Sequence, residues 1–209
     1  MTKENYIRAI AFFTLVMVGI FTLGVRISYP WQLNFMLVFL TLLGSLTCII
    51  IFRVSDQPMV SFVGVAGVSI LMGLMTGPLV AYYVGPVVLK AILTTAVVMG
   101  SMSVLGIVYP KAFEGLGPYL FGALLVLIIG QFASFIFLAF GFKQAAPMTL
   151  FAWLGVTIFT LYVAYDWSRA LQLEYTLDNA IDASGGLILD VINLFINLLQ
   201  IYGEKRGIS

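Results

Sequence analysis

Long apolar runs recur along this sequence, and their length limits what the chain can fold into more than any other feature. A helix needs about 20 apolar residues to cross the hydrocarbon core of a bilayer. Cutting the chain at its charges, prolines and polar clusters leaves seven segments of that length. They lie at about residues 6–27, 31–52, 59–83, 86–109, 118–140, 147–168 and 184–202. Because these runs are continuous rather than alternating, they predict helices and not a barrel. We therefore expect an all-α bundle of seven transmembrane helices, forming a single domain over residues 1–209.

The composition excludes an ordinary water-soluble domain. Of the 209 residues, 62% are apolar and only 9% are charged, whereas soluble domains carry about a quarter charged residues. The net charge of +1 argues against nucleic acid as a partner, since that binding needs a concentrated basic patch. With no His and one Cys, structural zinc, an intrachain disulfide and a His-assisted nucleophile are excluded. We expect the lipid bilayer as the surroundings and no tightly bound cofactor.

Basic residues at the ends of the predicted spans indicate the orientation, because cytoplasmic loops are enriched in Lys and Arg. One side, that of the N-terminus, carries Lys3, Arg8, Arg53, Lys111 and Arg169. The other side carries Arg26, Lys143, Lys205 and Arg206, with Lys90 a turn inside. Five against four or five favours a cytoplasmic N-terminus by a narrow margin.

Two aspartates fall within the predicted spans, where ionisable residues are costly and indicate function. Asp166 lies near the end of the sixth span and Asp190 lies within the seventh. If the turn between these spans lies near 177–180, the two carboxyls are about equally far from it. An antiparallel hairpin would then bring them to a similar depth, so we predict that they face each other.

The seventh span continues this polar pattern. Asp190, Asn193, Asn197 and Gln200 recur at i, i+3, i+7 and i+10, which places them on one helical face. Such a stripe would be costly against lipid tails, so the seventh helix is expected near the centre of the bundle. Asn193 and Asn197 either hold neighbouring helices together through hydrogen bonds or line a polar path. The sequence leaves both interpretations open.

A close pair of carboxyls in a low-dielectric setting can act as a proton sensor. Both groups cannot easily ionise, so they share one proton and titrate in two coupled steps. When the second proton leaves, repulsion can shift the hairpin. Alternatively, a hard cation such as Ca²⁺ can replace the proton, with Asp166 and Asp190 as metal ligands.

Arg53, at the end of the second span, is a candidate latch for Asp166, although a simple topology role explains it equally well.

Three segments resemble the transmembrane Bax inhibitor motif family (Bax inhibitor-1-like proteins). They are Leu-Tyr-Val-Ala-Tyr-Asp at 161–166, Leu-Asp-Val-Ile-Asn-Leu-Phe-Ile-Asn-Leu-Leu at 189–199 and Gly-Leu-Met-Thr-Gly-Pro at 73–78. The resemblance implies a seven-helix bundle with a central last helix, which acts as a pH-sensitive calcium leak channel. It further implies that Asp166 and Asp190 form the proton sensor, with Ca²⁺ and protons as the ions handled. The length and short termini fit a bacterial member in the cell membrane. The family's arginine near the end of the second helix has no exact counterpart, and Arg53 is the nearest.

Two other functions compete with a channel. An intramembrane aspartyl protease also pairs a Tyr-Asp with a second aspartate, but its second motif is Gly-x-Gly-Asp. Here Ile188 and Leu189 precede Asp190 and no Pro-Ala-Leu motif is present, so we expect that the protein is not an enzyme. A non-conducting regulator that binds a membrane protease or another channel is the remaining alternative.

Overall fold

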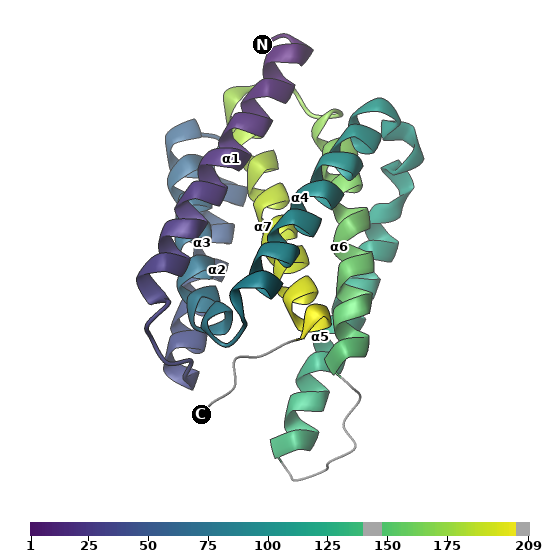
Figure 1. Ribbon diagram of the computed structural model, residues 1–209. Helices are drawn as coiled ribbons and strands as arrows, with labels where there is room; N and C mark the ends of the chain where they lie inside the picture. Colours follow the sequence, from purple (N-terminus) through teal and green to yellow (C-terminus); the bar gives the residue numbers. More distant parts are fainter. Residues whose placement is uncertain (140–147, 204–209) are drawn as a thin grey trace. The chain divides into compact units, whose positions relative to one another are not determined.

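Seven long α-helices make up nearly all of the computed structural model, which describes residues 1–139 and 148–203 (Figure 1). Two short 3-10 turns, at Pro110–Ala112 and Glu114–Leu116, separate α4 from α5. Within the described residues, all seven helices are long and apolar enough to cross a membrane. The all-α, seven-helix prediction is therefore confirmed. The helices are α1 Lys3–Ser28, α2 Phe35–Val54, α3 Pro58–Ala81, α4 Gly85–Val108, α5 Gly117–Ala139, α6 Met148–Ala170 and α7 Leu177–Tyr202.

Local capping residues decide where several helices start. The α2 helix begins at Phe35 and not at residue 31 as predicted, because the Asn34 side chain accepts a hydrogen bond from the Leu37 amide at 2.8 Å. Such a bond satisfies an amide that has no partner within the helix. The α3 helix begins at Pro58, where a missing N–H costs nothing.

The largest correction concerns α7, which begins at Leu177 and not at residue 184. The Thr176 hydroxyl accepts a hydrogen bond from the Asn179 amide at 3.1 Å, so Thr176 caps the helix. Asp178 and Asp182 therefore belong to the first turns of α7, whereas the predicted span began only at residue 184. That connection spans only residues 171–176.

The chain divides into two compact units. The first contains residues 1–85 and 170–192, and therefore α1, α2, α3 and the first part of α7. In this unit α1 packs closely against α3, where a Cβ on Gly73 would meet the backbone of Phe21 and stand 3.0 Å from the Gly24 Cα. The Ser28 hydroxyl donates a hydrogen bond to the Gly24 carbonyl at 3.0 Å and also lies 3.4 Å from the Gly73 carbonyl. Small residues thus allow two helix backbones to approach closely.

The second unit contains residues 86–169 and 193–203, of which 140–147 lie outside the described residues. In this unit α4 meets α6 at Gly106, where a Cβ would stand 2.6 Å from the Ala164 carbonyl oxygen. The Ser168 hydroxyl near the end of α6 donates to the Pro110 carbonyl at 2.7 Å. These contacts hold the end of α6 that carries Asp166.

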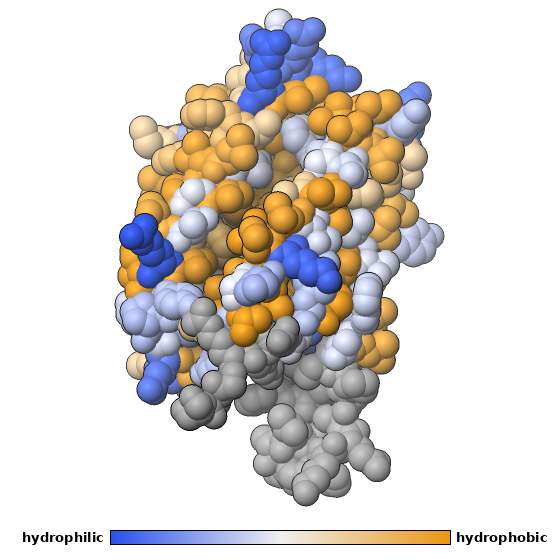
Figure 2. All heavy atoms as spheres, viewed as in Figure 1, coloured by the Kyte–Doolittle hydropathy of each residue, from blue (hydrophilic) through white to orange (hydrophobic). Residues whose placement is uncertain are grey.

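Exposed apolar side chains cover the outside of the helices, as expected for a chain surrounded by lipid. Figure 2 shows a visible face that is largely orange, with one group of blue hydrophilic side chains at the end where the N-terminus lies and smaller blue groups elsewhere. The α7 helix differs from the others, because 67% of its most apolar stretch is buried, compared with 44% for α3 and less for the remaining five. The prediction that the seventh helix is central is therefore confirmed.

Candidate functional site

The α7 helix carries a polar stripe that is longer than the sequence analysis predicted. Asp178 and Asp182 precede Asp190 on the same helix and continue the stripe toward the start of α7. At 100° per residue the whole set lies within an arc of about 120°, and it extends for about 33 Å at 1.5 Å per residue. Its members are Asp178, Asp182, Asp190, Asn193, Asn197 and Gln200. Within the described residues, the helix with the largest buried share thus carries this polar stripe.

Asp190 lies in the middle of this stripe and is 4% exposed. Asp166 is half-buried near the end of α6, between the buried side chains of Ala164 and Trp167. Because the connection lies at residues 171–176, Asp166 is much nearer to it than Asp190. The equal spacing that led us to pair the two carboxyls is therefore wrong. Their pairing remains a prediction that rests on the family resemblance.

The two asparagines that follow Asp190 have different surroundings. Asn197 is 5% exposed, and its amide nitrogen donates to the Asn193 carbonyl at 2.7 Å. It packs against α6 at Gly155, where a Cβ would stand 2.5 Å from the Asn197 Oδ1 atom. Asn193 is half-buried. For Asn197 the geometry agrees with a role in helix contact, and a polar path along α7 remains a prediction.

Arg53 lies in the last turn of α2 with an exposed side chain. Its guanidinium carbon is 5.2 Å from the centroid of the Phe52 ring, a cation–π contact. Arg53 also acts electrostatically on the carboxyl of Asp182. Arg53 and Asp182 both belong to the first unit, whereas Asp166 belongs to the second. The latch between Arg53 and Asp166 stays a prediction.

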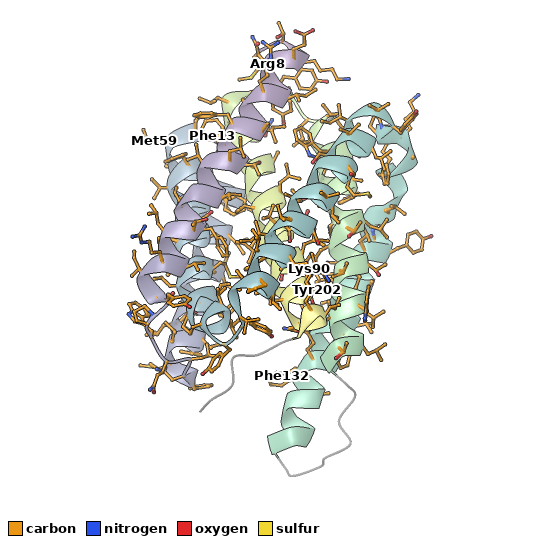
Figure 3. The ribbon with its side chains drawn as sticks, viewed as in Figure 1. Arg8, Phe13, Met59, Lys90, Phe132 and Tyr202 are labelled. Carbon is orange, nitrogen blue, oxygen red and sulfur yellow. The ribbon has the colours of Figure 1, made fainter. Side chains whose placement is uncertain are left out.

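Lys90 of α4 contacts the end of α7. Its Nζ atom lies 4.2 Å from the centroid of the Tyr202 ring (Figure 3). The Tyr202 hydroxyl is also 2.9 Å from the Thr94 hydroxyl. A cation–π contact and a hydrogen bond thus join α4 to the last turn of α7. Sequence reasoning noted Lys90 only as a basic residue near a helix end.

Asp182 is not among the site residues that were predicted from the sequence. Its charge was treated as a sign that the membrane span had ended. The useful signal was Thr176, a residue type that commonly caps a helix, followed by the acidic Asp178 in the first turn. In the part of the chain that the structure describes, no three Cys, Asp or Glu side chains lie close enough to hold a metal ion.

Comparisons with known proteins place the chain among membrane proteins. The family described as "Inhibitor of apoptosis-promoting Bax1" matches residues 3–207. The protein LIFEGUARD 2 of Arabidopsis thaliana is 33% identical over 136 residues, which are 64% of this chain and 55% of the relative. The inner membrane protein YbhL of Escherichia coli K12 is 28% identical over 147 residues, 66% of this chain and 61% of the relative. An uncharacterized protein of Helicobacter pylori J99 is 32% identical over 145 residues, covering 68% and 58%. The chain thus spans little more than half the length of these curated relatives.

Proposed function

Since the chain belongs to the Bax inhibitor-1 family and is a multi-pass membrane protein, we propose that it is a pH-sensitive calcium leak channel of the cell membrane, not an enzyme. Asp166 and Asp190 are its proton sensor. The observation that carries this proposal is the position of Asp190, 4% exposed on the polar stripe of the most buried helix. An ionisable group at such a place is costly and therefore indicates function. A calcium leak is the activity that the resemblance of the last third of the chain implies.

The proposed mechanism uses the competition between protons and cations for carboxylate oxygens. At low pH, Asp166 and Asp190 share a proton and the helices that carry them stay together. At higher pH the second proton leaves, the two negative charges repel each other and the helices shift. Ca²⁺ is a hard cation that binds carboxylate and carbonyl oxygens, so the ionised pair also offers it a transient site. Asn193 and Asn197 continue the path along α7.

A flux assay on the purified full chain in liposomes tests this function. Ca²⁺ entry, followed with a fluorescent indicator inside the vesicles, should rise at least several-fold between about pH 5 and pH 8, as the shared proton is lost. Empty liposomes give the background leak. A flux that ignores pH throughout this range counts against the sensor. No flux at all would favour a non-conducting regulator.

The variant Arg53→Ala tests the latch separately. If the guanidinium holds Asp166 in a closed state, its removal should raise the resting Ca²⁺ leak severalfold at a fixed pH. In the background of Asp166→Asn the same change should add nothing, because the partner of the latch is already gone. An unchanged leak in Arg53→Ala would mean that Arg53 is no latch and serves only to orient the protein in the membrane.

A further inference from the structure

Polar side chains from three helices meet at the start of α7. Asp178 and Asp182 lie one turn apart there, Tyr6 belongs to the first turns of α1 and Ser61 belongs to the first turn of α3. We call these four residues the entrance cluster. All of them lie in the first unit, and Figure 1 shows the light green start of α7 beside the N-terminal end of α1. Asp182 accepts a side-chain hydrogen bond from Ser61 and interacts electrostatically with Tyr6 and Asp178, so the four side chains form one group.

Three oxygen atoms of the entrance cluster are buried and make no hydrogen bond to any described residue. They are the Tyr6 hydroxyl, the Asp178 Oδ1 and the Asp182 Oδ1. The Tyr6 side chain is fully buried, and its ring stacks on Tyr175 with centroids 4.8 Å apart. The ring is therefore fixed, its hydroxyl is closed off from water, and the hydroxyl interacts electrostatically with Asp182. Buried polar atoms normally have partners, so these three oxygens indicate a bound species.

The charge around the cluster defines the species that fits it. Asp182 has two acidic neighbours, Asp178 and Asp56, and one basic neighbour, Arg53. Asp182 and Asp178, with the exposed Asp56 acting on Asp182 as well, outnumber the one guanidinium of Arg53, which leaves an excess of negative charge. The Arg53 side chain is exposed and lies over the Phe52 ring, so it does not fill the cluster. Carboxylate and hydroxyl oxygens with excess negative charge are the ligands that a hard cation prefers.

We propose that the entrance cluster binds a hydrated divalent cation, and that Asp178 and Asp182 provide its charged ligands. The choice of Ca²⁺ as this cation rests on the proposed function. Two carboxylates and two hydroxyls offer fewer oxygens than the six to eight that Ca²⁺ takes, so water completes the shell and binding is weak. Weak binding suits an ion that must leave this site again during conduction. Asp190 lies eight residues further along α7, about 12 Å away at 1.5 Å per residue.

Terbium luminescence on the purified full chain in detergent tests the site without any flux. Tb³⁺ replaces Ca²⁺ at oxygen sites and is excited through nearby tyrosines, and added Ca²⁺ should displace it. Compared with the unchanged protein, Asp182→Asn should raise the Tb³⁺ midpoint about tenfold, and Tyr6→Phe, which keeps the stacked ring, should raise it severalfold. Arg53→Ala should lower the midpoint severalfold, because it removes a competing positive charge. Glu174→Gln, at an exposed acid in the α6–α7 connection, is the matched control and should leave it unchanged.

The outcomes separate this site from the proposed sensor. The proposal is overturned if Asp182→Asn and Tyr6→Phe both keep the midpoint of the unchanged protein while eluting as folded protein. It is also overturned if Asp190→Asn alone abolishes the binding, because the ion then sits at the sensor. Retained Tb³⁺ binding in a protein that shows no pH-dependent flux supports the entrance site and rejects the proposed function. Intact pH-dependent flux in a protein that binds no Tb³⁺ rejects the entrance site and supports the proposed function.

Discussion

Replacing Asp190 by Asn should abolish the pH dependence of the Ca²⁺ leak. The amide has nearly the shape of the carboxyl, but it has no proton to lose between pH 5 and pH 8. Asp190 is 4% exposed, so no ion from solvent can take the place of the lost carboxylate charge. We expect the several-fold rise of the leak across this range to shrink to less than about twofold, because a single remaining carboxyl has no coupled partner. The measurement is Ca²⁺ entry into liposomes at matched protein content.

Asp166→Asn should flatten the same profile if the two carboxyls work as a pair. Glu174→Gln serves as the control, since it also removes one acid but lies in the exposed connection between α6 and α7. Its profile should match that of the unchanged protein. An unaltered pH profile in both aspartate variants would remove the assignment of the sensor. Flattening in Asp190→Asn alone would leave Asp190 as a single sensor without a partner.

Gly73→Ala should cause a large loss of stability, because Gly73 of α3 lies against the backbone of α1. The new Cβ would meet the Phe21 carbonyl of α1 and stand 3.0 Å from the Gly24 Cα. These are backbone atoms, so no side chain can rotate away and the two helices must separate. Overpacking of this kind costs about 1–3 kcal/mol. The thermal unfolding midpoint of the detergent-solubilised protein, followed by aggregation or by a thiol-reactive dye at Cys48, should fall clearly.

Gly19→Ala is the matched control, because Gly19 lies on an exposed face of α1 and a Cβ there meets nothing within 4 Å. Alanine also favours helix more than glycine does. The midpoint of this variant should therefore stay level or rise slightly. Equal losses in Gly73→Ala and Gly19→Ala would mean that the close approach of α1 and α3 does not determine stability.

The number and the type of the helices could be predicted from the sequence because the length of an apolar run is set by the bilayer. Their ends were less predictable, since they depend on single caps. The Asn34 cap places the start of α2 later than predicted, and the Thr176 cap places the start of α7 two turns earlier than predicted. The second error had a consequence for function. Because the predicted span began too late, Asp178 and Asp182 were left outside the helix. The turn between α6 and α7 was also predicted at the wrong residues, and the depths of Asp166 and Asp190 were judged from that turn.

The surroundings of the site residues could not be read from the sequence, because they come from helices that are far apart along the chain. The polar face of α7 was visible as a spacing of three and four residues. The contact of Asn197 with Gly155 and the electrostatic interaction of Asp182 with Tyr6 were not visible in the sequence. No periodic pattern relates residue 6 to residue 182. Such contacts depend on how the helices pack, which one sequence does not encode in any local signal.

The polar stripe has a consequence for how the protein is made. A helix with three aspartates and two asparagines on one face is poorly suited to stand alone in lipid, where such residues lack partners. The α7 helix follows the other six in the chain, so its neighbours can already be in the membrane when it leaves the ribosome. Insertion of the last helix should then depend on the earlier ones, and a ribosome-bound chain without α1 to α3 should fail to integrate it.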